Sequence, residues 1–146
     1  MADVHSKKIR SYNMSKIKGK NTRPEIMVRK FLFSHGFRYR LNVKKLSGKP
    51  DIVLSKYRIV IFINGCFWHG HEGCKYFVVP KTRTEWWIDK IQKNKERDFK
   101  CEEELLGQNW RVITIWECEL KPDKRAQTLE QILYSIKESM CHNAET

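Results

Sequence analysis

Residues 58–74 read RIVIFINGCFWHGHEGC, an apolar run followed directly by a loop rich in glycine, cysteine and histidine. The run at residues 59–63 is apolar throughout and mostly β-branched, which predicts a strand that is buried on both faces and central in a sheet. The segment therefore predicts a central strand that carries chemically active side chains on the loop at its end.

The spacing of the loop side chains indicates a metal site. Cys66, His71 and Cys74 offer thiolate and imidazole ligands, which suit tetrahedral Zn²⁺. Cys118, directly after a second apolar run, is the natural fourth ligand, and a Cys3His set is typical of a structural zinc site. The alternative interpretation is a group of buried free cysteines with exposed histidines. His69 stands outside the set and is a candidate for proton transfer.

Positive charge is concentrated in the first third of the chain. The 146 residues carry a net charge of +12, and residues 1–50 hold 14 Lys/Arg against 2 Asp/Glu, which accounts for all of it. This asymmetry favours a polyanionic partner, most simply nucleic acid, over a merely solvated basic surface. Residues 1–20 predict a basic N-terminal arm that orders on a partner, and residues 21–146 predict a single domain.

Composition also limits where the protein works. No apolar run is long enough to span a membrane, and the N-terminus is too basic and polar for a signal peptide. The five cysteines are odd in number and spaced like metal ligands, which favours a reducing cytoplasm over a disulfide framework.

The rest of the chain predicts an α/β fold in which helices flank a mixed sheet. Thr22 to Glu25 form a capping-box pattern that predicts a helix ending near Gly36, and on these residues alone Glu25 is the capping partner of Thr22. Residues 37–41 alternate apolar and basic, which predicts a half-exposed strand. Further strands are predicted at 51–54, 58–63 and 112–116, the last of them buried, and helices at 85–106 and 129–140.

Asp51 begins the strand that precedes the central one. If the two strands pair antiparallel, Asp51 lies opposite residues 61–63, at the mouth of the Cys/His loop. A carboxylate there is a hard oxygen ligand suited to Mg²⁺, although proline followed by aspartate is also common in turns. Pro50 predicts an extended backbone at Lys49.

Two pairs of adjacent aromatic residues, Phe67-Trp68 and Trp86-Trp87, lie in polar surroundings. Large apolar side chains exposed near positive charge wedge between base pairs or stack on bases. Ordinary core packing is the alternative, and one of Trp86 and Trp87 is expected in the core because adjacent helix positions point in different directions.

Together these features resemble the very-short-patch-repair (Vsr) endonuclease family, over nearly the whole chain from Met1 to about Met140. The matching strings are Met1-Ala-Asp-Val-His5, Asn13-Met14, Gly48-Lys-Pro-Asp51, Gly65-Cys-Phe-Trp-His69, Pro80-x-Thr-Arg-Thr-Glu85, Asn94-x-x-Arg97-Asp98 and Trp116-Glu-Cys118. The string that ends at His69, followed by the zinc ligands, is highly specific.

The resemblance implies a restriction-endonuclease-like fold and a Mg²⁺-dependent enzyme that nicks double-stranded DNA 5′ of the thymine in a T:G mismatch. Such nicks begin very short patch repair of deaminated 5-methylcytosine. By the same resemblance, Asp51 binds Mg²⁺ with the backbone carbonyl of Ile63, and His69 is the general base. Glu25 orients metal-bound water. Asn64 stands where relatives often have histidine, and asparagine can hydrogen-bond such a water but cannot take a proton.

The resemblance also assigns the remaining site residues. Structural Zn²⁺ is implied on the Cys3His set described above, and a wedge beside the mismatch is implied for Phe67, Trp68 and Trp87. It implies a monomer in the bacterial cytoplasm, associated with the nucleoid, that works with mismatch-repair proteins such as MutL. Two other functions stay open: a non-catalytic zinc-dependent DNA-binding module, and a nuclease for ordinary or branched duplexes.

Overall fold

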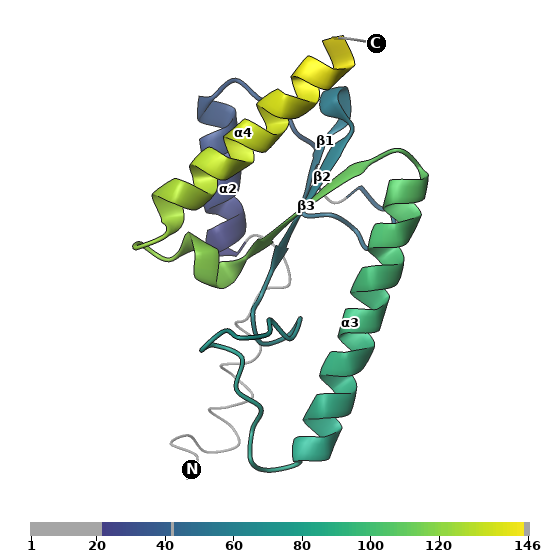
Figure 1. Cartoon of the computed structure of the whole chain (residues 1–146), viewed down its shortest axis with the longest axis vertical. Coiled ribbons are helices and arrows are strands. Elements are labelled where there is room, and N and C mark those ends of the chain that lie inside the picture. The colour runs from purple at the N-terminus through teal and green to yellow at the C-terminus, as the bar shows by residue number, and fades with distance from the viewer. Residues whose placement is uncertain (1–21, 42, 145–146) are drawn as a thin grey trace.

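The computed structural model describes residues 22–41 and 43–144. The predicted basic arm at residues 1–20 lies outside the described residues. Among those that are described, no helix combines the length and apolarity needed to cross a membrane. The elements are α2 (Arg23–Ser34), β1 (Ile52–Leu54), η1 (Ser55–Tyr57), β2 (Ile59–Asn64), α3 (Thr84–Gly107), β3 (Arg111–Trp116), η2 (Glu117–Leu120) and α4 (Arg125–Ala144) (Figure 1).

The fold is the predicted small α/β arrangement with a mixed sheet. Within the described ranges the sheet has the order β1-β2-β3, so the apolar run is the central strand. β1 pairs antiparallel with β2 through Ile52 opposite Ile61, and β3 pairs parallel with β2, ending at Asn64 opposite Trp116. The ends of β2 and β3 therefore lie side by side, where the Cys/His loop begins.

Helices cover both faces of the sheet (Figure 1). Because successive strand side chains point to opposite faces, Ile59 and Ile61 pack in one core with α2 and α4, and Val60 packs in another with Leu105 of α3. All four side chains are fully buried. Burial on both faces explains why the central strand has no polar residue before Asn64.

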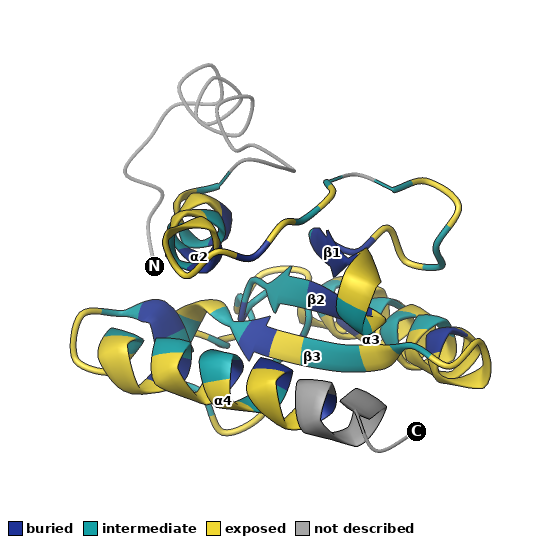
Figure 2. Ribbon diagram, turned by 90° about the horizontal axis from the view of Figure 1, so that it is seen from above, coloured by how far each residue is buried: buried dark blue, intermediate teal, exposed yellow. Residues whose placement is uncertain are grey.

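Two of the strand predictions need correction. Residues 37–41 form no strand; Arg40 makes a single antiparallel bridge to Val53, because β1 is only three residues long and offers no longer partner. The strand predicted at 112–116 forms as β3, but most of its residues are not buried. It lies at the edge of the sheet (Figure 2), and Ile115 is its one buried residue.

The capping box predicted at the start of α2 is wrong. Thr22 is the N-cap but makes no side-chain cap hydrogen bond. Glu25 instead turns inward, where it is 4% exposed and accepts a hydrogen bond from the Arg29 guanidinium at 3.1 Å. A buried carboxylate one turn into a helix is more costly than an exposed cap, so its position needs another explanation.

The extended backbone predicted for Lys49 is also wrong. Its φ is +49°, in the left-handed region, directly before Pro50. The preceding Gly48 has φ +76°, and the Lys49 N–H donates to the Leu46 carbonyl at 3.2 Å. The tight turn therefore overrides the usual preference of a residue before proline.

Candidate active site and metal centre

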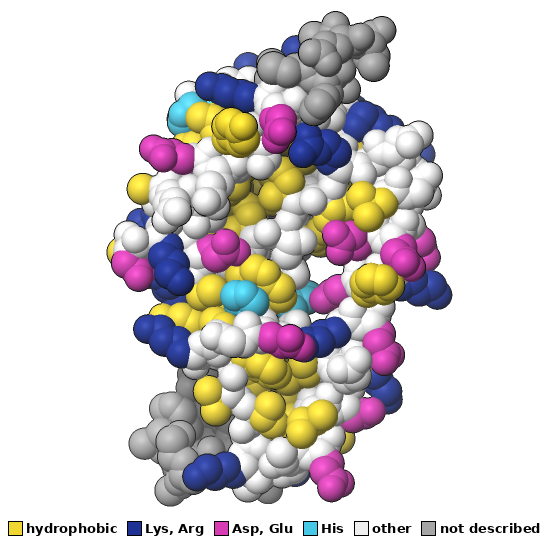
Figure 3. Space-filling view, viewed as in Figure 1, with side chains coloured by type: hydrophobic (Ala, Val, Ile, Leu, Met, Phe, Trp, Pro, Cys, Tyr) yellow, Lys and Arg dark blue, Asp and Glu magenta, His cyan; other side chains and the backbone are white. Residues whose placement is uncertain are grey.

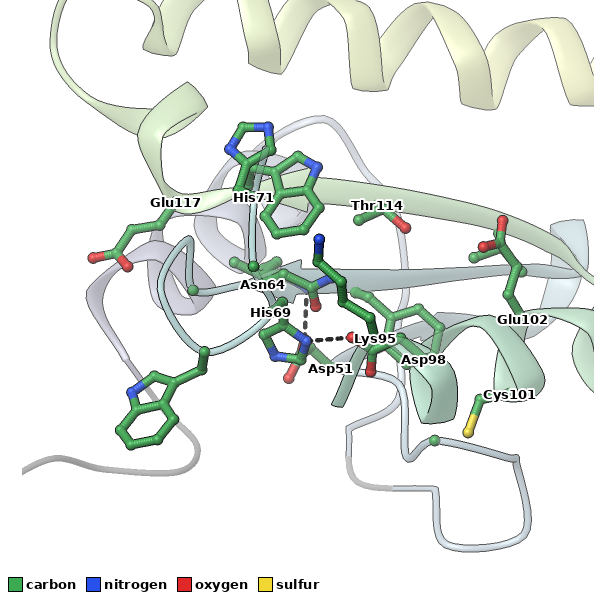
Figure 4. A pocket seen from close by; sticks show the side chains of 18 of the residues that line it. Asp51, Asn64, His69, His71, Lys95, Asp98, Cys101, Glu102, Thr114 and Glu117 are labelled. Atoms are coloured by element: carbon green, nitrogen blue, oxygen red, sulfur yellow. Dashed lines mark hydrogen bonds and ion pairs between the residues drawn. The ribbon is translucent and has the colours of Figure 1, made fainter. Parts of the chain in front are cut away.

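A cleft of about 1130 Å³ opens between the start of α2, the turn before β1, the end of β2, β3 and the middle of α3. Seven of the site residues predicted from the sequence line it: Glu25, Asp51, Ile63, Asn64, Trp68, His69 and His71. Figure 4 shows the Asp51 and His69 side chains together in this cleft. An acid and an imidazole from separate parts of the chain thus converge on one space.

Asp51 is held by the antiparallel pairing that the sequence predicted. Its N–H donates to the Ile61 carbonyl at 3.0 Å, and its carboxylate accepts a hydrogen bond from the Ile63 N–H at 2.6 Å. In a strand the N–H and C=O of one residue point to the same neighbour, so the Ile63 carbonyl lies on the Asp51 side of β2. One carboxylate and one carbonyl oxygen therefore border the cleft together.

The environment of Asp51 disfavours its negative charge. The pKa of this carboxyl is raised from 3.8 to about 6, chiefly by burial and further by the nearby charge of Glu25, although the hydrogen bond from Ile63 lowers it. His69 and Arg29 act in the opposite sense, since positive charge lowers this pKa. Two acids facing one cleft are a donor set that fits a hard divalent cation, which binds carboxylate and carbonyl oxygens.

His69 is positioned by α3. Its Nδ1 lies 2.6 Å from Oδ2 of Asp98, as the dashed line in Figure 4 marks. An ionised Asp98 accepts a hydrogen bond from Nδ1–H, which leaves Nε2 with a lone pair to accept a proton. Within the loop, the His69 N–H donates to the Gly65 carbonyl at 3.2 Å, which fixes the backbone as well.

Two residues of α3, Asn94 and Asp98, contact the loop in a way that the sequence did not reveal. Asn94 and Asp98 are four residues apart, so they share one face of the helix. Asn94 donates from Nδ2 to the Trp68 carbonyl at 2.9 Å, next to the contact between Asp98 and His69. The i, i+4 spacing of two short polar side chains was the available signal. It did not say which loop they would meet.

The four predicted zinc ligands come together. The ligand atoms of Cys66, His71, Cys74 and Cys118 all lie within 4.8 Å of one another, and Cys118 Sγ is 3.5 Å from His71 Nδ1. Tetrahedral zinc with bonds of about 2.0–2.3 Å places its ligand atoms about 3.3–3.8 Å apart. The Cys3His set fits such an ion after small side-chain adjustments.

Burial favours the protonated form of two of the thiols when no metal is bound. Burial raises the pKa of Cys66 to about 12 and raises that of Cys118, whereas the backbone N–H of Tyr76 lowers the pKa of Cys74. Buried thiols stay neutral without a cation, and a bound metal stabilises the thiolates. The His71 ring is also fixed, because it stacks on Trp116 at 4.1 Å and 4°.

The predicted aromatic wedge forms one cluster beside the cleft. Phe67 lies 5.3 Å from both Trp68 and Trp87 between ring centroids, and Trp68 lies 5.8 Å from Trp87. Trp86 adds an edge-to-face contact to Trp87 at 4.8 Å. Trp68 and Trp86 are exposed at 37% and 45%, and hydrophobic side chains gather below the central histidines in Figure 3. Trp87 is the less exposed member of its pair.

Comparison with known proteins gives one consistent result. A family model described as DNA mismatch endonuclease Vsr matches residues 2–75. The chain is 50% identical over 141 residues to the Type II nicking enzyme V.NmeAIP of Neisseria meningitidis, with 96% of this chain and 100% of the relative covered. It is 43% identical over 141 residues to DNA mismatch endonuclease Vsr of Escherichia coli K12, with 97% and 89% covered.

A side chain should cost more stability at one glycine of the loop than at another. Gly70 has φ +62°, and a Cβ there would meet the Lys95 side chain and lie 2.7 Å from Ile91 Cγ2. Gly73 has φ +73° with nothing within 4 Å of such a Cβ. We expect Gly70→Ala to lower the free energy of unfolding by about 1–3 kcal/mol more than Gly73→Ala, measured by urea denaturation. Equal losses would contradict the packing of the loop on α3.

The raised pKa of Asp51 predicts a pH-dependent stability. Between pH 4 and 6 the folded protein binds more protons at Asp51 than the unfolded chain, so its stability falls as pH rises through this window. Asp51→Asn removes the effect. Without added Mg²⁺, the variant should gain up to about 3 kcal/mol over wild type at pH 7, and little at pH 4, in urea denaturation. A gain that is equal at both pH values would contradict the burial of this charge.

Proposed function

The chain belongs to the Vsr family of DNA mismatch endonucleases, and on that premise we propose that it nicks double-stranded DNA 5′ of the thymine in a T:G mismatch. As a DNA endonuclease it hydrolyses phosphodiester bonds in DNA repair. The observation that carries the proposal is the convergence of Asp51 and His69 on one cleft beside an exposed aromatic cluster. Water, a base and a cation-binding carboxylate are what phosphodiester hydrolysis requires.

In the proposed mechanism, Asp51 and the Ile63 carbonyl would hold Mg²⁺, which would supply positive charge at the scissile phosphate. His69 takes the proton of the attacking water at Nε2. Asp98 keeps Nδ1 protonated and stabilises the imidazolium that results, because its carboxylate is only 2.6 Å away. The proton transfer thus uses a base whose tautomer and ring orientation are set in advance.

Two further side chains act on the water in this proposal. Glu25 lies close enough to Asp51 to affect its charge, and its burial in the cleft places a second acceptor near the cation. This role explains why a carboxylate at this position turns inward rather than capping α2. Asn64, at the end of β2, donates or accepts a hydrogen bond and cannot take part in proton transfer.

Structural Zn²⁺ is assigned to the Cys3His set. His69 is two residues before the ligand His71 and three after the ligand Cys66, so an ion bound by this set restrains the backbone on both sides of the base. The Cys118 N–H also donates to Cys66 Sγ at 3.4 Å, which connects η2, directly after β3, to the loop. A Zn²⁺ held by these four residues would keep the imidazole in place and would take no part in hydrolysis.

The preference for T:G is assigned to the aromatic cluster. A wedge of Phe67, Trp68 and Trp87 must unstack the bases next to it, and a wobble pair resists this less than a Watson–Crick pair. We place the enzyme in the bacterial cytoplasm on the nucleoid, as a monomer that recruits repair proteins such as MutL. A binding module without catalysis would leave the pairing of His69 with Asp98 unused, so hydrolysis is the better interpretation.

A nicking assay tests this function. The wild type should nick a T:G duplex with Mg²⁺, and should leave the same duplex with EDTA and matched T:A and C:G duplexes intact. Asp51→Ala should abolish nicking while DNA binding persists, and His69→Ala should slow single-turnover nicking by about 10²-fold or more. Asp89→Ala, an exposed acid paired with Lys93 on α3, is the control and should be fully active. Full activity of Asp51→Ala would remove that residue from the mechanism.

The zinc assignment has its own test. Cys118→Ser should lower the zinc content and the melting temperature together, because the metal couples to folding. Cys101→Ser is the matched control, since Cys101 lies on α3 outside the ligand set. Elemental analysis of the purified proteins measures the metal. Wild-type protein with no zinc, or a Cys118→Ser variant with full zinc, would overturn the assignment.

A further inference from the structure

The cleft is strongly acidic for a site that receives DNA. Six carboxylates line it: Glu25, Asp51, Glu72, Asp98, Glu102 and Glu117. The lysines among the described lining residues are Lys49 and Lys95. A phosphodiester entering this cleft meets repulsion from the carboxylates, and its charge grows as water attacks. The two lysines are therefore the cationic side chains of the described lining that could contact the phosphate.

Lys95 is already engaged. Its ammonium lies 3.0 Å from Oε1 of Glu72, and its stem lies against Gly70 of the loop. These contacts hold α3 against the Cys/His loop. The ion pair with Glu72 also neutralises the charge of Lys95 within the protein. Lys49 differs, because no carboxylate of the described residues lies within 4.0 Å of its ammonium, and the residue is exposed.

The backbone of Lys49 is held in an unfavourable conformation. A φ of +49° is uncommon for any residue with a side chain. It is still less favourable before Pro50, which restricts its predecessor to extended geometry. Glycine would fit the turn without strain, yet the chain has lysine there. Such strain concentrates at functional sites, where the side chain is needed in that place.

We propose that Lys49 is a further catalytic residue, whose ammonium contacts a non-bridging oxygen of the scissile phosphate. The inference rests on the proposed nicking function. Lys49 is two residues before Asp51, at the same cleft mouth, and a flexible four-carbon stem carries its charge. The ammonium neutralises the charge that develops on the phosphate oxygens as water attacks phosphorus and the bond to the leaving sugar oxygen breaks. The proton of the attacking water goes to His69, and the sugar oxygen takes a proton from solvent.

Single-turnover nicking of a T:G duplex at saturating enzyme tests the proposal. Lys49→Met should slow the rate by about 10²-fold, as loss of one transition-state donor does, and Lys49→Arg should restore most of it because the charge returns. Lys45→Met is the control from the same loop; Lys45 is exposed and does not line the cleft, so its rate should match wild type. A Lys49→Met rate within 5-fold of wild type would overturn the proposal.

Lys49→Gly separates catalysis from folding. Glycine adopts positive φ freely, so this variant should melt at or above the wild-type temperature while losing the same activity as Lys49→Met. A fall in melting temperature together with the rate would make the residue structural and overturn the proposal. If wild type itself fails to nick the T:G duplex, the proposed function fails. If wild type nicks normally and Lys49→Met is also active, only the role of Lys49 is overturned, and the proposed function stands.

Discussion

The antiparallel pairing of β1 with the end of β2 sets where the cleft has its carboxylate. Asp51 donates its N–H to the Ile61 carbonyl and receives the Ile63 N–H on its side chain, so both backbone and carboxylate follow the register of the central strand. A slip of one residue would turn Ile59 and Ile61 from one core to the other. Packing on both faces of β2 therefore fixes the acid as firmly as it fixes the core.

The His69 imidazole, which faces Asp51 across the cleft, is held in place by different interactions. His69 belongs to a glycine-rich loop without a core of its own, and it is held from two sides. Asp98 fixes the imidazole through Nδ1, and the cluster of cysteines with His71 restrains the backbone next to it. The long helix α3 is the common support, since Asn94 and Asp98 bind the loop from one helical face. Rigid support of this kind is what a positioned base needs.

Much of this arrangement could be predicted from the sequence. The apolar run at residues 59–63 predicted the central strand. The strand before it predicted an antiparallel pair with Asp51 at the mouth of the Cys/His loop. The spacing of Cys66, His71 and Cys74 predicted a set of metal ligands. Glu25 could not be placed, because a capping box and an inward carboxylate have the same sequence pattern. The backbone of Lys49 was mispredicted because a local rule for residues before proline gave way to the turn formed with Gly48. Asp98 needed the docking of α3 on the loop, which no local pattern contains.

The central claim is that one divalent cation, one carboxylate and one imidazole share a single site. Paramagnetic broadening by Mn²⁺ in place of Mg²⁺ tests it directly in the ¹⁵N-labelled protein. The Ile63 amide and the His69 imidazole signals should broaden first, and the broadening should vanish in Asp51→Asn. His35, at the C-terminal end of α2 and outside the cleft, should stay sharp. A sharp His69 signal beside a broadened Ile63 amide would contradict the claim.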